Sequence, residues 1–73
     1  MKQAAKVEIR RKARIIRGTT NLLVNDVSYI CSDADDFDLV ALGESIPEFK
    51  ATIEQLVDHV AELEYAVYLS RQK

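Results

Sequence analysis

The most regular pattern of apolar residues in this chain lies in its C-terminal third. Apolar side chains recur there at intervals of three and four residues, the spacing of one face of an α-helix; they are Ile46, Phe49, Ile53, Leu56, Val60, Leu63 and Val67. Ser45 and Glu48 form a capping box ahead of this run, and Pro47 is tolerated in the first turn because its missing N–H has no acceptor there. The sequence therefore predicts a helix over about 46–71.

The middle of the chain favours β-structure. The segments 27–32 and 37–42 are rich in Val, Ile, Tyr and Phe, and the polar residues 33–36 between them are suited to a hairpin turn. Upstream, residues 22–24 either precede a tighter turn at Asn25-Asp26 or belong to one strand, 22–32, that contains a bulge. The sequence predicts strands over about 22–32 and 37–42.

The N-terminal segment fits two different periodicities. From residue 6 to residue 15, every even position is charged and four of the five odd positions are apolar, which is typical of a half-buried strand. A thinner helical stripe runs through Ala5, Ile9, Ala13 and Ile16, and Gly18 would end such a helix. The alternation favours a strand over about 6–16, and a helix over 2–17 is the alternative.

These elements predict a single α+β domain that comprises residues 1–73. A four-residue turn at Gly18–Asn21 would complete a three-stranded antiparallel β-meander (about 6–16, 22–32, 37–42), packed on one face by one long C-terminal helix (about 46–71). The alternative fold has an N-terminal helix, a β-hairpin and the same C-terminal helix. Either fold covers the apolar stripe of that helix with its own chain, so a monomer is favoured over a helix-mediated dimer.

Charged residues are separated into blocks along the chain. Residues 1–17 carry seven cations and one acid, whereas residues 18–70 carry eleven acids and one cation, Lys50; the formal net charge of the chain is −2. Such polarity orients charged partners and sets association rates. The basic segment either meets a partner or pairs with the acidic body of its own chain.

Three groups of residues are candidates for binding a protein partner. Four acids at the expected hairpin tip would meet a basic surface, and three arginines would meet an acidic one. Two tyrosines and a leucine outside the main helical stripe would supply an apolar anchor. The groups are Asp33, Asp35, Asp36 and Asp38; Arg10, Arg11 and Arg14; and Tyr65, Tyr68 and Leu69.

No residue pattern indicates catalysis, a cofactor or a metal. A calcium-loop frame that starts at Asp33 places Phe37 at a ligand position and Asp38 where the loop requires glycine. One cysteine and one histidine form neither a disulfide nor a zinc set, which favours the reducing cytoplasm. No apolar run reaches the ~18 residues that a membrane span needs. We therefore expect a cytoplasmic protein that is not an enzyme.

In size, in its separated charge blocks and in its lack of catalytic motifs, the chain resembles small phage-encoded regulators that bind host RNA polymerase or similar host machinery. The resemblance implies transcription inhibition in the host cytoplasm. We predict a non-enzymatic regulatory protein that binds a protein partner by charge complementarity plus an apolar anchor. The alternatives are a small nucleic-acid-binding protein that uses the basic N-terminal segment, and a dimeric structural or assembly subunit that uses the C-terminal helix.

Overall fold

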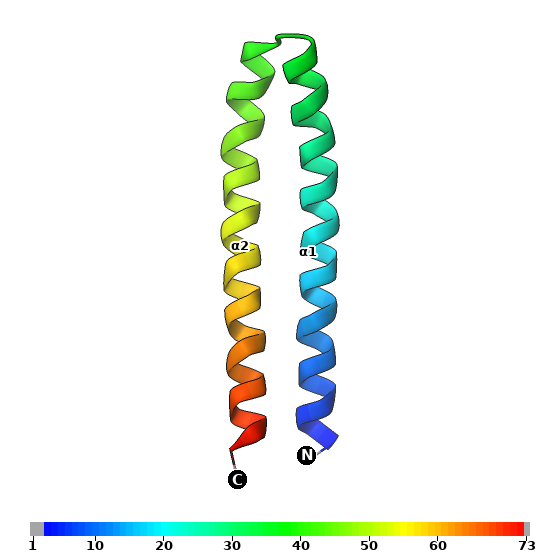
Figure 1. Ribbon diagram of the computed structural model, residues 1–73, viewed down its shortest axis with the longest axis vertical. Helices are drawn as coiled ribbons and strands as arrows, with labels where there is room; N and C mark the ends of the chain where they lie inside the picture. Colours follow the sequence, from blue (N-terminus) through cyan, green and yellow to red (C-terminus); the bar gives the residue numbers. More distant parts are fainter. Residues whose placement is uncertain (1–2, 73) are drawn as a thin grey trace.

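The computed structural model describes residues 3–72 and shows a helical hairpin (Figure 1). Helix α1, Gln3–Asp35, and helix α2, Leu39–Arg71, have 33 residues each. The helices run antiparallel, side by side along their whole length, so the start of α1 and the end of α2 lie opposite the turn. The hairpin measures 55 × 14 × 12 Å. The described part of the chain is therefore a rod.

The predicted α+β fold is wrong, because no strand occurs between residues 3 and 72. The expected strands 6–16 and 22–32 both lie within α1, and the expected strand 37–42 includes the turn and the start of α2. The alternative with a β-hairpin fails for the same reason, although residues 3–17 are helical. Gly18, expected to stop a helix or begin a turn, lies inside α1.

The alternation of charged and apolar residues in 6–15 is also compatible with a helix, because charged residues recur there at intervals of four. Lys6, Arg10 and Arg14 follow this i, i+4 spacing and therefore lie on one helical face. Glu8 pairs with Arg11 and with Lys12, at spacings of three and four residues that stabilise a helix but not a strand. The alternation was thus no evidence for β-structure.

Helix α2 ends where the apolar spacing predicts, at Arg71, but begins seven residues before the predicted start. Its N-cap is Asp38, so the predicted capping box at Ser45 and Glu48 is wrong. Pro47 lies inside the helix, where it lacks the N–H that would bond to the carbonyl of Gly43.

The seam between the helices follows a seven-residue repeat in which apolar and polar rows alternate. On α1 the least exposed residues recur at intervals of three and four; the apolar row is Ile9, Ile16, Leu23 and Ile30, and the polar row is Lys12, Thr19, Asp26 and Asp33. On α2 the rows are Leu42, Phe49, Leu56 and Leu63, and Ser45, Thr52, His59 and Ala66. In an antiparallel pair the two apolar rows meet on one side of the seam and the two polar rows on the other.

Two helices alone bury very little. Within residues 3–72 no apolar residue is buried, and the one buried residue is Thr19, with 7% of its surface exposed. Neither helix contains a stretch apolar enough to cross a bilayer, as far as the described residues go. The hairpin therefore lacks the core that normally offsets the entropy of ordering a chain.

Replacing Gly18 with alanine tests the helical assignment directly. A Cβ at Gly18 would meet nothing within 4 Å, and its φ is not positive. Glycine inside a helix is about 1 kcal/mol less favourable than alanine, so Gly18→Ala should raise the free energy of unfolding by about that amount. Urea unfolding at one fixed protein concentration, followed by circular dichroism at 222 nm, measures this change. A loss of stability would favour the β-turn that the sequence pattern predicts.

Candidate functional site

The turn between the helices is a tight C-terminal cap followed at once by an N-terminal cap. The N–H of Phe37 donates to the carbonyl of Ala34, and the N–H of Asp38 donates to that of Asp33, at 3.1 and 2.9 Å. This pair of bonds is the Schellman arrangement that ends many helices. Asp38 then caps α2, because its Oδ1 accepts the N–H of Ala41 at 3.1 Å.

Phe37 occupies the position in this turn where glycine is usual. Its φ of 51° is left-handed, a conformation that costs an ordinary L-residue about 1–2 kcal/mol. The side chain is 83% exposed, so it stabilises nothing within the hairpin. Leu39 and Val40, the next apolar residues, are also strongly exposed. The turn therefore presents three exposed apolar side chains. We call these three residues, together with the adjacent acids Asp35, Asp36 and Asp38, the tip.

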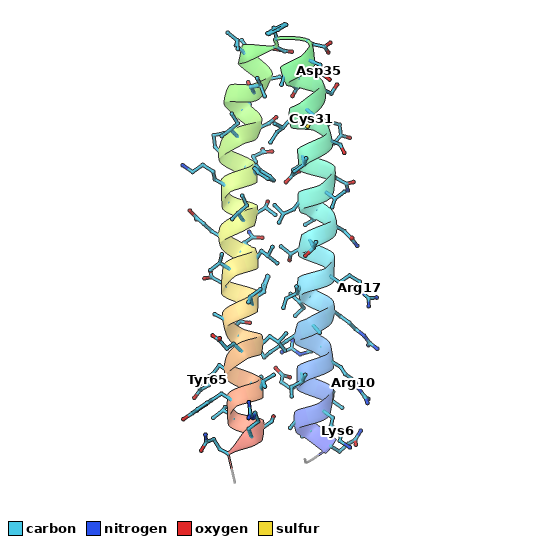
Figure 2. All side chains as sticks on the ribbon, in the orientation of Figure 1. Lys6, Arg10, Arg17, Cys31, Asp35 and Tyr65 are labelled. Atoms are coloured by element: carbon cyan, nitrogen blue, oxygen red, sulfur yellow. The ribbon has the colours of Figure 1, made fainter. Side chains whose placement is uncertain are left out.

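All four predicted acidic residues lie at the tip, although a helical hairpin and not a β-hairpin places them there. Asp35 is the last residue of α1 (Figure 2), Asp36 follows in the turn, and both are exposed. Asp38 is engaged as the N-cap, and Asp33 is half-buried in the polar row of the seam. Asp35 and Asp36 are thus the acids most available to a partner.

The predicted basic residues lie near the opposite end of the rod, on the side of α1 turned away from α2. Figure 2 shows Lys6, Arg10 and Arg17 pointing away from α2. Arg11 is held by Glu8, with Nη2–Oε1 2.6 Å and Nε–Oε2 3.2 Å. The contact with Arg11 lowers the pKa of Glu8 below its ordinary value of 4.5 and raises that of Arg11.

Only one residue of the basic segment pairs with the acidic α2 among the described residues. Lys12 Nζ lies 3.5 Å from Glu62 Oε2 across the seam and 3.4 Å from Glu8 Oε1. No ion pair holds Lys6, Arg10, Arg14 or Arg17 to any residue between 3 and 72. Internal neutralisation of the basic segment is therefore slight, and these four cations form an outward-facing group that we call the basic face.

Tyr65 and Tyr68 form a stacked pair on α2, with ring centroids 6.4 Å apart and planes 19° apart. Both rings and Leu69 are exposed. They lie near the C-terminal end of α2, and the rise of a helix puts Tyr65 about 40 Å from Asp38 at the tip. The predicted anchor and the predicted acidic surface therefore do not form one contact.

The predicted apolar stripe of α2 divides between two surroundings. Phe49, Leu56 and Leu63 face α1, whereas the row at the same seven-residue spacing beside them is 38–49% exposed; it consists of Ile46, Ile53, Val60 and Val67. Val27 of α1 is exposed on the same side of the seam. These five residues define the apolar face. Its four α2 residues were expected to pack on a β-sheet, and no strand exists between residues 3 and 72 to cover them.

No metal centre is apparent in the part of the chain that the structure describes, since no group of three or more His, Cys, Asp or Glu side chains is placed to hold an ion. Nδ1 of His59, in the polar row, is buried and has no hydrogen-bond partner among residues 3–72. Cys31 is exposed and free. Comparison with known proteins finds no match to a family model, to a curated protein or to a solved structure.

The ion pair between Glu8 and Arg11 predicts a measurable titration. Because Arg11 stabilises the ionised carboxylate, the pKa of Glu8 should lie below 4.5 and should return towards that value in Arg11→Gln. Its contribution to stability is complete above the ordinary pKa and is lost as the pH falls through the lowered one. NMR titration of the Glu8 carboxyl carbon measures its pKa in the wild type and in Arg11→Gln. An unchanged Glu8 pKa in Arg11→Gln would show that the pair does not form in solution.

Proposed function

We propose that the chain is a non-enzymatic regulatory protein that binds a protein partner through its tip. The observation that carries this proposal is the exposed Phe37, held in a left-handed conformation between Asp36 and Asp38. The left-handed backbone closes the turn that ends α1, but glycine would serve there without strain, and the exposed ring makes no contribution to the fold. A strained residue of this kind is characteristic of a functional contact. The tip thereby combines the two parts of the predicted mechanism, an apolar anchor and clustered negative charge.

The chemistry of the tip specifies the partner surface. Burying a phenylalanine contributes about 1.5–3 kcal/mol, whereas exposed charge pairs contribute about 0.2–1 kcal/mol each and act chiefly on association rate. The matching surface is an apolar pocket with lysine or arginine at its rim. Host RNA polymerase in the cytoplasm, the partner implied by the resemblance to phage regulators, stays a prediction. Basic, nucleic-acid-binding enzymes offer surfaces of this kind.

Replacing Phe37 with glycine should separate stability from binding. Glycine removes the left-handed strain, so the free energy of unfolding should rise or stay level within about 1 kcal/mol. Loss of the anchor should weaken partner binding about 10–100-fold. A partner captured from a bacterial lysate on the wild-type chain would be purified, and its affinity for both chains compared by biolayer interferometry.

Two controls make this test specific. Tyr65→Ala removes another exposed ring about 40 Å away and should leave the affinity unchanged. Asp35→Asn with Asp36→Asn should slow association and reduce its salt dependence, while the cap at Asp38 stays intact. Equal binding by wild type and Phe37→Gly would eliminate the tip as the docking site, and loss with Tyr65→Ala alone would move the site to the tyrosine pair.

A second candidate function, binding to a nucleic-acid backbone, is favoured by the basic face. Its four cations are spaced at four, four and three residues, are exposed and have no ion-pair partner among the described residues. Four phosphate contacts would give weak binding, in the non-specific range of about 10⁻⁴–10⁻⁶ M, with a log–log salt slope of about −3 to −4 on duplex DNA. The acidic remainder of the chain opposes this binding.

The paired variants Arg10→Gln with Arg14→Gln should reduce that salt slope by about 2. Arg11→Gln is the matched control, since Arg11 is already engaged by Glu8, and it should change the slope by much less. Fluorescence anisotropy with a labelled duplex over a salt series measures both. Absence of any salt-dependent binding, or an equal effect of the Arg11 control, would remove this candidate.

A further inference from the structure

The hairpin exposes more surface than a compact protein of its mass. Its accessible surface is 5868 Å² for 8.3 kDa, whereas a compact monomer of that mass exposes about 4,600 Å². Its radius of gyration is 16.7 Å, compared with about 11 Å for a compact chain of this length. The difference, about 1,300 Å², is surface that a compact chain would bury and that the hairpin leaves exposed to solvent.

The longest row of exposed apolar side chains lies on one side of the rod. The apolar face lies beside the two half-buried apolar rows, so apolar residues form a continuous band along the seam and α2. The opposite side carries the polar rows, the ion pair Lys12–Glu62 and a shorter apolar run on α1, Ile15, Leu22 and Tyr29. A single covering surface on the apolar side would turn the half-buried rows into a core.

We infer that a second copy of the chain covers the apolar face and that the two hairpins form an antiparallel four-helix bundle. The seven-residue spacing of Ile46, Ile53, Val60 and Val67 is the spacing of helices packed at about 20° in such bundles. The available area fits as well. A subunit of a stable dimer buries about 800 Å² or more, and the excess of about 1,300 Å² exceeds that value.

Charge fixes the relative direction of the two copies. In the half of the rod nearest the chain ends, residues 3–19 carry six cations and one acid and residues 56–72 carry three acids and one cation, a net charge of +3. The half nearest the turn, residues 20–55, carries eight acids and one cation, a net charge of −7. Turns at the same end would place two strongly negative halves together, so the turns lie at opposite ends.

This arrangement leaves the tip free, so it is independent of the proposed function. Each end of the bundle carries the acidic tip of one copy beside the basic helix end of the other. The two tips are separated by the length of the rod.

Sedimentation equilibrium from about 1 to 500 μM tests the inference on the unaltered chain. The expected mass is twice 8.3 kDa. Val60→Asp places a carboxylate on the apolar face and should raise the dissociation constant at least about 100-fold. Leu22→Asp makes the same kind of change at a similarly exposed position on the polar side, 56% against 49%, and should leave the dissociation constant within about threefold.

Disulfide trapping tests the direction and does not depend on a destabilised variant. Thr20 lies next to Thr19, the midpoint of α1, so Thr20→Cys with Cys31→Ser should give a crosslinked dimer on mild oxidation. The native Cys31 lies twelve residues from that midpoint, so its two copies would be about 36 Å apart and should not crosslink.

A helical monomer at every concentration, or dissociation by Leu22→Asp as severe as by Val60→Asp, would overturn the dimer. Efficient crosslinking through Cys31 would overturn its antiparallel direction. None of these outcomes affects the comparison of Phe37→Gly with the wild type. If that comparison shows no role for the tip in binding, the expected mass of the dimer is still the same.

Discussion

The packing of one helix against one other helix is the constraint on which this structure depends. Each helix has a single partner, so each can cover only one side of itself, and no apolar residue between positions 3 and 72 becomes buried. Half of the seam is apolar and half is polar, with Lys12 reaching Glu62 on the polar side. That asymmetry gives the hairpin one face that water solvates well and one that it does not.

The rod keeps apart in space the charge blocks that are separate along the chain. The acidic residues stay at the turn and the basic residues stay near the chain ends, so the polarity of the sequence becomes a polarity of the molecule along its 55 Å length. Local features then decide which charges are available. Arg11 is occupied by Glu8 and Asp38 by the start of α2, whereas Asp36 and Arg10 are exposed.

The C-terminal helix could be predicted because its apolar spacing has no interruption, and the position of the acids at a turn followed from their polarity. Helix α1 could not be predicted in this way, because apolar and polar residues alternate among its positions that face α2. Lys12, Thr19 and Asp26 interrupt the apolar stripe by which a helix is recognised in a sequence. The β-branched and aromatic residues of 27–32 then supplied a competing local signal. The sequence pattern placed Phe37 in the predicted strand 37–42. Its left-handed backbone could not be expected, because phenylalanine rarely adopts that conformation.

The missing core also bears on the lifetime of the protein in a cell. If the order of the chain depends on the dimer inferred above, the chain is protected from proteolysis only in proportion to the amount that is assembled. Newly made chains at low abundance would be degraded quickly, and chains above a threshold would persist. Expression level would thus act as a switch, and a modest change in synthesis rate would produce a disproportionate change in the amount of working protein.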